Sequence, residues 1–421
     1  MAHWKTPTDL LPMSPLKVLI CGGGCAGPAL ASWLARSGHH VTIVERFPAL
    51  RASGAQIDLR AQGIEVVKRM GLLDTVRSKV VYQAGISIVD EQNRNIATIM
   101  ANRSGKGAQT FTSEYEIMRG DLVRILYDAT KDNVEFIFGK TVEHFKQYDD
   151  RVEVQFSDGR TDSFDLLVGA DGQASRIRKE ILPPDAPEPY NRLGIYLAYW
   201  FMPRTERDSN MGKRYHSLGS RVVMSRSHSV TETQGCFAIK DDSEELMSLS
   251  KAPVEQQKEF WAHKFSDAGW DTARFIEGMK ASDYFYCQEV LQVKSDTWYK
   301  NRVVLLGDAG YCPSPFTGMG TTASFVGAYV LAGEINRNSQ NIPQALANYD
   351  RVLRPFVDEL QVLNRPLIRL TFPQSQLGIS ILHFIAGTIC YLRIPELVAR
   401  FSKEDKGGWQ LPDYIELQQG Q

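Results

Sequence analysis

Four short, largely apolar runs stand out along the chain, at residues 18–21, 41–44, 164–170 and 303–306. Runs of this length are typical of parallel strands that are buried on both faces. A helical spacing of apolar positions joins the first two runs and ends at Gly38, a residue that favours a helix stop. The pattern therefore predicts a β-α-β unit at the start of an α/β fold.

Residues 190–240 follow a different pattern, because they alternate with period two and are rich in Tyr, Trp, Phe and Arg. Such alternation predicts one face of an antiparallel sheet, which would form a second domain. The other expected elements are two short strands within 85–100, helices at 253–266 and 271–279, a strand at 283–293 and a long helix at 343–370.

Composition and charge exclude several classes of function. With 43% apolar and 23% charged residues, the chain is an ordinary globular protein, and its net charge of -1 argues against electrostatic nucleic-acid binding. Its longest apolar run, residues 379–392, is shorter than the roughly 20 residues that cross a bilayer, so no stable membrane insertion is expected. Scattered cysteines, with Cys21 and Cys25 bracketing a glycine turn, indicate neither disulfides nor a metal site. We expect a cytoplasmic protein, either a monomer or a homodimer.

The first strand is followed by a glycine fingerprint. Gly22, Gly24 and Gly27 complete G-x-G-x-x-G, and Glu45 ends the second strand 23 residues after Gly22. The first glycine allows a tight turn, the second lets the backbone approach a pyrophosphate, and the third lets helix pack on strand. An acid at the end of the second strand accepts hydrogen bonds from ribose hydroxyls. Together these features predict a dinucleotide site.

Two further strand ends carry similar signals. Asp171-Gly172 follows the third apolar run and Gly307-Asp308 follows the fourth. Ligands of an open parallel sheet bind outside the carboxyl ends of its strands, so the three ends would converge on one extended dinucleotide. A loop with Pro315, Gly318, Gly320 and Thr321 comes next and leads into a helix whose N-terminus would face the ligand.

With these motifs in place, the chain resembles the class A flavoprotein monooxygenases, which share the fold of para-hydroxybenzoate hydroxylase. Within them it looks most like the branch of the tetracycline-inactivating monooxygenases and the hydroxylases of polyketide and alkaloid biosynthesis. The resemblance covers roughly residues 16–370. Many relatives carry Ala-His after the Gly-Asp pair, where this chain has Ala309, Gly310 and Tyr311, and Asn where it has Thr321.

The resemblance implies an FAD cofactor and an NAD(P)H co-substrate, with NADPH favoured, and no metal. Arg51 matches a position implicated in NADPH use, and Thr321 would lie near the flavin ring. The residues expected at the cofactor are Gly22, Gly24, Gly27, Glu45, Arg46, Arg51, Asp58, Arg119, Asp171, Asp308, Pro315, Gly318, Gly320 and Thr321.

The expected fold is α/β, with a Rossmann-like FAD-binding domain of the GR2 flavoprotein type, an inserted antiparallel-sheet substrate domain and a C-terminal helical segment. The expected divisions are an arm at 1–15, the FAD-binding domain at 16–82, 112–185 and 284–370, the substrate domain at 83–111 and 186–283, and the C-terminal segment at 371–421. This last segment is expected to close over the core or the site entrance rather than to contact a membrane surface.

The implied reaction begins with NAD(P)H reducing FAD, and the reduced flavin reacts with O2 to a C4a-hydroperoxide. One oxygen atom then passes to an electron-rich aromatic or enolic carbon of a polycyclic small molecule, in secondary metabolism or xenobiotic modification. Epoxidation, Baeyer–Villiger insertion, a reductase and a non-catalytic flavin-binding protein stay open as alternatives.

A phenol reacts faster as its phenolate, so a base or cation beside the substrate would help. In the aromatic sheet, the predicted substrate-positioning residues are Arg221, His216 and Tyr215, with Tyr199 and Arg226 as further candidates. Arg221 is the first choice because its segment aligns loosely with a substrate-side arginine in the tetracycline-modifying relatives.

Overall fold

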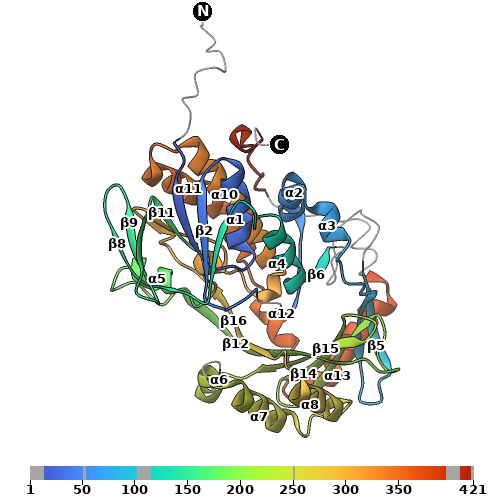
Figure 1. Ribbon diagram of the computed structural model, residues 1–421. Helices are drawn as coiled ribbons and strands as arrows, with labels where there is room; N and C mark the ends of the chain where they lie inside the picture. The colour runs from blue at the N-terminus through green and yellow to red at the C-terminus, as the bar shows by residue number, and fades with distance from the viewer. Residues whose placement is uncertain (1–13, 51–53, 102–114, 250–251, 395–407, 419–421) are drawn as a thin grey trace, which may run out of the picture.

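The computed structural model describes residues 14–50, 54–101, 115–249, 252–394 and 408–418. A six-stranded sheet in the order β17-β18-β11-β1-β2-β7 forms the upper half of the molecule in Figure 1, and all its strands are parallel except β17. Its members are β1 (Lys17–Cys21), β2 (His40–Glu45), β7 (Glu135–Phe138), β11 (Leu166–Gly169), β17 (Tyr299–Lys300) and β18 (Val303–Leu305). The predicted α/β fold with a largely parallel sheet is therefore confirmed.

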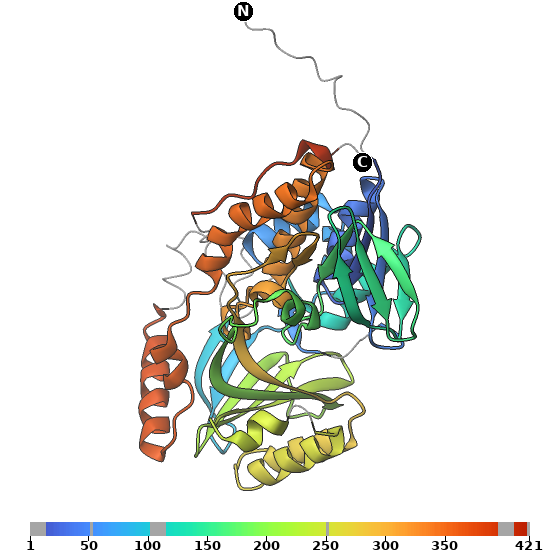
Figure 2. The same cartoon turned by 90° about the vertical axis from the view of Figure 1, so that its left-hand side faces the viewer.

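The two faces of this sheet are covered differently. The largest apolar core lies between one face and a helical layer that includes α1 (Ala26–Arg36) and α10 (Gly320–Arg337). The other face packs against α5 (Arg176–Ile181) and a three-stranded antiparallel sheet, which Figure 2 shows beside the main sheet. The strands of this small sheet are β8 (Val142–Gln147), β9 (Val152–Phe156) and β10 (Thr161–Phe164). The apolar run at 164–170 is thus divided between β10 and β11.

Several shorter elements complete this half of the molecule. They are the paired strands β3 (Gln56–Asp58) and β6 (Glu116–Met118), the helices α2 (Ala61–Arg69), α3 (Leu73–Arg77), α4 (Arg119–Asp128) and α9 (Asp308–Tyr311), and the 3-10 turn η1 (Pro315–Thr317).

A seven-stranded, mostly antiparallel sheet in the order β16-β12-β15-β14-β13-β4-β5 forms the lower half. Its strands are β4 (Gly85–Val89), β5 (Asn95–Met100), β12 (Tyr190–Pro203), β13 (Met211–Ser217), β14 (Arg221–Ser227), β15 (Glu232–Lys240) and β16 (Tyr286–Val293). Strand β16 was expected in the FAD-binding domain, but it pairs with β12 from Tyr190↔Val293 to Tyr199↔Tyr286. It belongs to this sheet because its backbone hydrogen bonds are satisfied there.

Both faces of the seven-stranded sheet are covered. One face packs against α6 (Glu244–Leu249), α7 (Val254–Phe265) and α8 (Thr272–Ala281) through a core rich in Trp and Phe. The other face carries a smaller apolar cluster that includes Ile195, Val222 and Phe372. Successive side chains along a strand therefore point to two covered faces in turn, rather than to the core and to solvent.

The long helix expected at 343–370 is two helices. Helix α11 (Ile342–Leu360) ends at Gln361, and α12 (Arg365–Leu370) starts after Asn364, whose side chain accepts a hydrogen bond from the Leu367 amide. Pro366 in the first turn of α12 has no amide hydrogen for a continuing helix, which accounts for the break.

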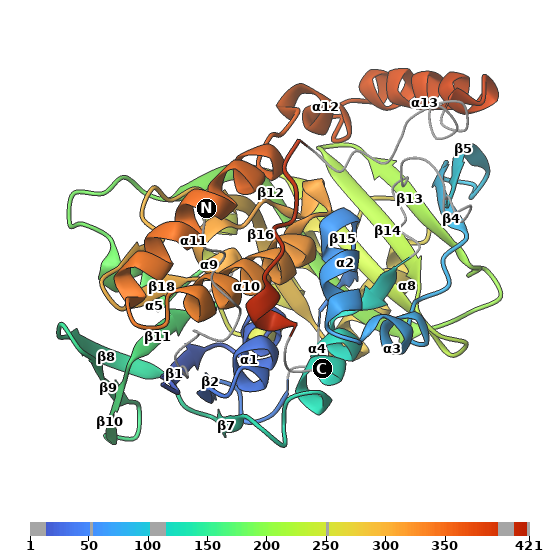
Figure 3. The same cartoon turned by 90° about the horizontal axis from the view of Figure 1, so that it is seen from above.

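Helix α13 (Gln376–Tyr391) corresponds to the long apolar run and lies along β5 at the edge of the seven-stranded sheet (Figure 3). Among the described residues, no helix is long and apolar enough to cross a bilayer. Residues 408–418 return to the upper half, where the Tyr414 hydroxyl donates to Glu334 at 2.8 Å and the short turn η2 (Ile415–Leu417) contacts α10.

Candidate active site

A cavity of about 1360 Å³ extends between the two sheets and is closed on one side by α12 and α13. The predicted residues that line it are Gly22, Gly24, Glu45, Arg46, Asp58, Arg119, Asp171, His216, Asp308, Pro315, Gly318, Gly320 and Thr321, together with the candidates Tyr199 and Arg226. Gly27, Tyr215 and Arg221 are not part of its lining, and Arg51 lies outside the described residues. The three strand-end motifs therefore converge on one cavity, as the sequence predicts.

The glycine turn is shaped by contacts that leave no room for side chains. Gly22 has φ +122°, and a Cβ there would lie 2.3 Å from the Ala170 carbonyl oxygen. A Cβ at Gly27 would lie 2.1 Å from the Gly22 oxygen, so Gly27 acts in helix packing below the cavity rather than in its wall. The backbone from Gly22 to Gly24 thus forms a concave edge at the start of α1.

Two acidic side chains of the cavity wall, Glu45 and Asp58, are held by hydrogen bonds or an ion pair. Glu45 accepts hydrogen bonds from the Gly23 amide at 2.7 Å and the Phe47 amide at 3.0 Å, which fix its carboxylate at the cavity wall. Asp58 pairs through Oδ2 with Arg60 at 3.0 Å, while its buried Oδ1 has no hydrogen-bond partner among the described residues. Its orphaned oxygen favours a ligand that donates hydrogen bonds.

A buried arginine that the sequence analysis did not single out joins the other two motifs. Arg178 donates to the Gln173 carbonyl at 2.6 Å, beside Asp171-Gly172, and to the Ala309 carbonyl at 2.6 Å, beside Gly307-Asp308. Its side chain is 1% exposed and also donates to the Tyr190 hydroxyl at 2.8 Å. Arg178 therefore sets the spacing of two loops that are more than 130 residues apart in the chain.

Asp308 begins α9 and faces the N-terminus of α10, at Gly320 and Thr321. Burial raises the pKa of the Asp308 carboxyl, with Arg119 opposing that shift. Tyr311, which differs from the family pattern, leaves the cavity unchanged, because the Tyr311 hydroxyl pairs with the Tyr349 hydroxyl at 2.8 Å inside the core. The Gly-Asp motif thus keeps its cavity-facing surface.

The seven-stranded sheet supplies the other end of the cavity. It is lined by Gly212, Lys213, Arg214 and His216 of β13 and by Met224, Ser225 and Arg226 of β14. Desolvation lowers the pKa of Arg214 to about 10, and burial with the nearby Arg214 charge holds the pKa of His216 well below its usual range. Arg226 forms an ion pair with Glu116, whereas among the described residues no carboxylate pairs with Arg214.

Arg221 and Tyr215 lie on the opposite face of the sheet. Arg221 forms an ion pair with Asp267 and donates to the Lys264 carbonyl at 2.7 Å, and the Tyr215 ring lies 5.7 Å from that of Trp270. An alternation of period two shows which residues share a face of the sheet, but it does not show which face lines the cavity. Arg214 is the cavity-facing arginine that the sequence analysis missed.

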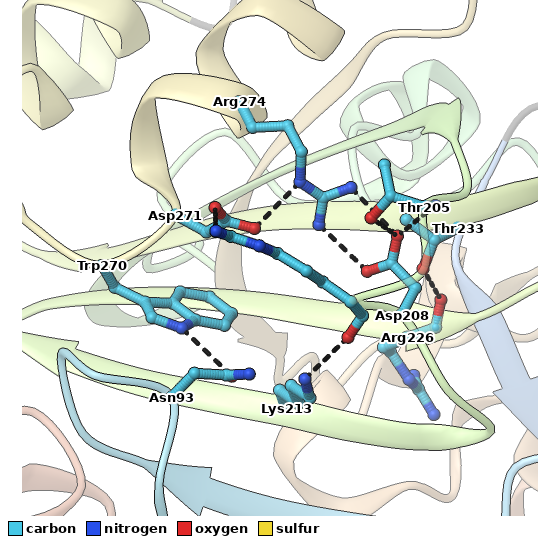
Figure 4. Close-up of polar contacts among 10 residues, drawn as sticks. Asn93, Thr205, Asp208, Lys213, Arg226, Thr233, Trp270, Asp271 and Arg274 are labelled. Atoms are coloured by element: carbon cyan, nitrogen blue, oxygen red, sulfur yellow. Dashed lines mark hydrogen bonds and ion pairs between the residues drawn. The ribbon is translucent and has the colours of Figure 1, made fainter.

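Polar residues on that opposite face are engaged with each other (Figure 4). Arg274 holds Asp208 with two hydrogen bonds of 2.9 and 3.0 Å and Asp271 with one of 2.9 Å. The Lys213 ammonium donates to the Arg207 carbonyl at 2.8 Å. These contacts fasten α8 and the β12–β13 connection to the sheet, so we assign them to the support of the cavity wall.

Helix α13 closes the cavity with apolar side chains. Leu382, Ile385, Ala386 and Ile389 line it, and Leu367 and Leu370 of α12 extend the same wall. The uncharged run at 379–392 predicted the helix, but its position over the cavity depends on packing against β5. The end of the cavity at the seven-stranded sheet therefore has an apolar wall opposite a polar strand.

The residues present fit FAD. A Cβ at Gly22 would collide with the Ala170 backbone, and buried oxygens of Asp58 and Asp171 lack partners among the described residues. A phosphate group requires a close backbone with amides and a helix N-terminus, and ribose hydroxyls require acceptor oxygens. The cavity offers the close backbone at Gly22–Gly24 and acceptor oxygens on Asp58 and Asp171.

Comparisons with known proteins agree with this geometry. Residues 15–360 match the family model described as "FAD binding domain". The chain is 40% identical to "FAD-dependent monooxygenase asL6" of Sarocladium schorii, over 96% of this chain and 99% of that protein. It is 38% identical to "Flavin-dependent monooxygenase eupH" of Phoma sp, over 89% and 92%. The solved structure of tetracycline destructase Tet(51) is similar with a TM-score of 0.75 and 30% identity, over 96% of this chain and all of that one.

Proposed function

Because the chain belongs to the FAD-binding-domain family and is an FAD-dependent monooxygenase, we propose that it oxidises NADPH in preference to NADH and inserts one oxygen atom into a polycyclic aromatic or enolic molecule. The balanced reaction consumes one NADPH, one proton and one O2, and it gives the hydroxylated product, NADP+ and water. The observation that carries the proposal is the single cavity shared by the nucleotide motifs and the seven-stranded sheet.

FAD bound in this cavity would supply the two-electron chemistry and the activation of O2. The backbone at Gly22–Gly24 would hold the pyrophosphate, and Glu45 would accept from the ribose hydroxyls. Asp308 and the N-terminus of α10 would face the ribityl chain and the ring. Arg178 would hold the two loops at the spacing that this arrangement requires.

The substrate end favours a molecule with an acidic hydroxyl. Arg214 places a cation in the cavity wall, and no carboxylate of the described residues neutralises it. A cation stabilises a phenolate or enolate, and the ionised form donates electrons to the carbon that accepts oxygen. The relative named tetracycline destructase indicates that this fold accepts a fused-ring molecule, which suits the volume of the cavity and its apolar wall.

Water exclusion falls to α12 and α13. Leu367, Leu382, Ile385 and Ile389 present hydrocarbon to the substrate end. An apolar wall strengthens the electrostatic effect of Arg214 and would keep water away from the reacting groups.

The test is a turnover assay with the FAD-loaded protein. NADPH oxidation, O2 uptake and product mass are measured for a panel of polycyclic phenols, including alizarin (1,2-dihydroxyanthraquinone). We expect a compound that stimulates all three in a 1:1:1 ratio and gains one oxygen atom from 18O2. Turnover without O2 would indicate a reductase and contradict the proposal, as would NADPH oxidation that no phenol stimulates. Light scattering of the same sample tests our expectation of a monomer or homodimer.

A further inference from the structure

The guanidinium of Arg214 is held by acceptors that carry no charge. Its Nε donates to His216 Nε2 at 3.1 Å, and one terminal nitrogen donates to the Thr371 carbonyl at 3.0 Å. The guanidinium carbon lies 5.7 Å from the centre of the Phe372 ring. Neutral acceptors orient an arginine without cancelling its charge, so Arg214 remains able to attract an anion.

The contact with Arg214 also determines the state of His216. An arginine can only donate, so His216 Nε2 must carry its lone pair and the ring must be neutral. The ring is 3% exposed, and its Nδ1 has no hydrogen-bond partner among the described residues. Two neighbouring groups, Arg214 on the same strand and His383 on α13, oppose protonation of this imidazole. The ring centres of His216 and His383 lie 5.6 Å apart. His216 is therefore a fixed acceptor rather than a general base.

The second acceptor is fixed by the turn between β13 and β14. The Ser220 hydroxyl donates to the Phe372 carbonyl at 3.0 Å, and the Gly219 amide donates to the Gln374 carbonyl at 2.9 Å. These bonds seat the connection between α12 and α13 on the same sheet that carries Arg214. The Thr371 carbonyl thus stands at a set position relative to β13.

Arg226 provides an internal contrast. It also lines the cavity, but its ion pair with Glu116 compensates its charge. Two arginines on neighbouring strands thus differ in what they can offer to a ligand: within the described part of the chain, a carboxylate compensates the charge of Arg226 but none compensates that of Arg214.

We propose, on the basis of the function proposed above, that His216 is a positioning residue: its Nε2 lone pair, together with the Thr371 carbonyl, fixes Arg214 as the receptor for an ionised hydroxyl of the substrate. The substrate class is thereby narrowed to phenols or enols that bind as anions. His216 contributes through Arg214 and does not itself take up the proton.

The experiment uses alizarin as the probe, because its visible absorption changes on ionisation. The apparent pKa of alizarin bound to FAD-loaded protein is measured by spectrophotometric titration in wild type and in Arg214→Met, His216→Leu and His216→Gln variants. The Gln side chain places an amide oxygen near the position of Nε2. If His216→Leu does not load FAD, His216→Met takes its place.

We expect wild-type protein to lower the apparent pKa of bound alizarin by about one unit relative to free alizarin. Arg214→Met should abolish the shift, His216→Leu should reduce it, and His216→Gln should restore most of it. A shift that survives Arg214→Met, or one that His216→Leu leaves intact, would overturn the inference while leaving the monooxygenase function standing. If wild-type holoenzyme binds no alizarin, the titration uses the phenol of the panel that stimulates turnover, and the proposed substrate class is itself wrong if no phenol of the panel binds.

Discussion

The cavity has a nucleotide end, at Gly22–Gly24, and a sheet end, at β13 and α13. The two ends differ in the kind of atoms that form their surfaces. At the nucleotide end, backbone atoms form much of the surface, and a Cβ added at Gly22 would lie 2.3 Å from a carbonyl oxygen. At the sheet end, side chains form the surface, including Arg214, His216 and the apolar residues of α13. A backbone surface accepts one ligand shape, whereas a side-chain surface can change its ligand without changing the fold. The cofactor is thus determined by the fold, and the substrate by a few side chains.

We expect the substitution Gly22→Ala to have the largest effect on the nucleotide end of the cavity. The added methyl group meets the Ala170 backbone, and φ is +122°, so we expect a loss of about 4 kcal/mol in unfolding free energy and little bound FAD. Gly159→Ala is the matched control, because Gly159 also has a positive φ, +82°, but no atom within 4 Å of the added Cβ. The FAD-to-protein absorbance ratio and the urea midpoint measure both variants. Equal effects in the two would show that strain, not the cradle, causes the loss.

Arg178→Met tests whether the two loops depend on one side chain. The change removes hydrogen bonds to the Gln173 and Ala309 carbonyls and to Tyr190, which should cost about 3 kcal/mol and weaken FAD binding. Lys179→Met, on the exposed side of the same helix, should change neither quantity. Retention of wild-type FAD affinity in Arg178→Met would mean that the loops keep their spacing without this arginine.

At the sheet end, Arg214→Met should leave FAD content unchanged and lower kcat/KM roughly thirtyfold, a loss of about 2 kcal/mol in transition-state stabilisation. The control is Arg221→Met, which removes a similar charge from the other face of the same sheet and should alter kcat/KM less than twofold. Steady-state kinetics with a substrate found in the phenol panel measure both. A larger loss in Arg221→Met would contradict our assignment of the faces.

The same contrast explains what the sequence could predict. The nucleotide end follows from local motifs, since Gly22, Glu45, Asp171 and Asp308 each stand at a strand end whose position the pattern reveals. The sheet end depends on which face of the sheet meets the cavity, and both faces are covered with apolar side chains. Alternation could therefore select Arg221 as readily as Arg214. The role of Arg178 was hidden for a similar reason, because it bridges loops that only tertiary structure brings together.

The smallest expected effect concerns acid stability. The native state keeps His216 neutral, with its pKa held well below the usual range, while the unfolded chain takes up a proton below about pH 6.5. Below this pH the unfolded state binds more protons than the native state. The free energy of unfolding therefore decreases as the pH falls below 6.5 toward the native pKa of His216. When the pH is lowered from 7.0 to 5.5, the free energy of unfolding of His216→Gln, measured by urea denaturation, should decrease by about 1 kcal/mol less than that of wild type. His40→Gln, an exposed histidine, serves as the control. If both variants follow the wild-type curve, His216 is not held neutral.

The most direct test of a cavity shared by cofactor and substrate is a crystal structure of the FAD-loaded protein with bound alizarin. We predict FAD against the Gly22–Gly24 backbone and Asp308, and a hydroxyl oxygen of alizarin within hydrogen-bond distance of Arg214. FAD elsewhere, or alizarin bound outside the wall formed by β13 and α13, would contradict the account.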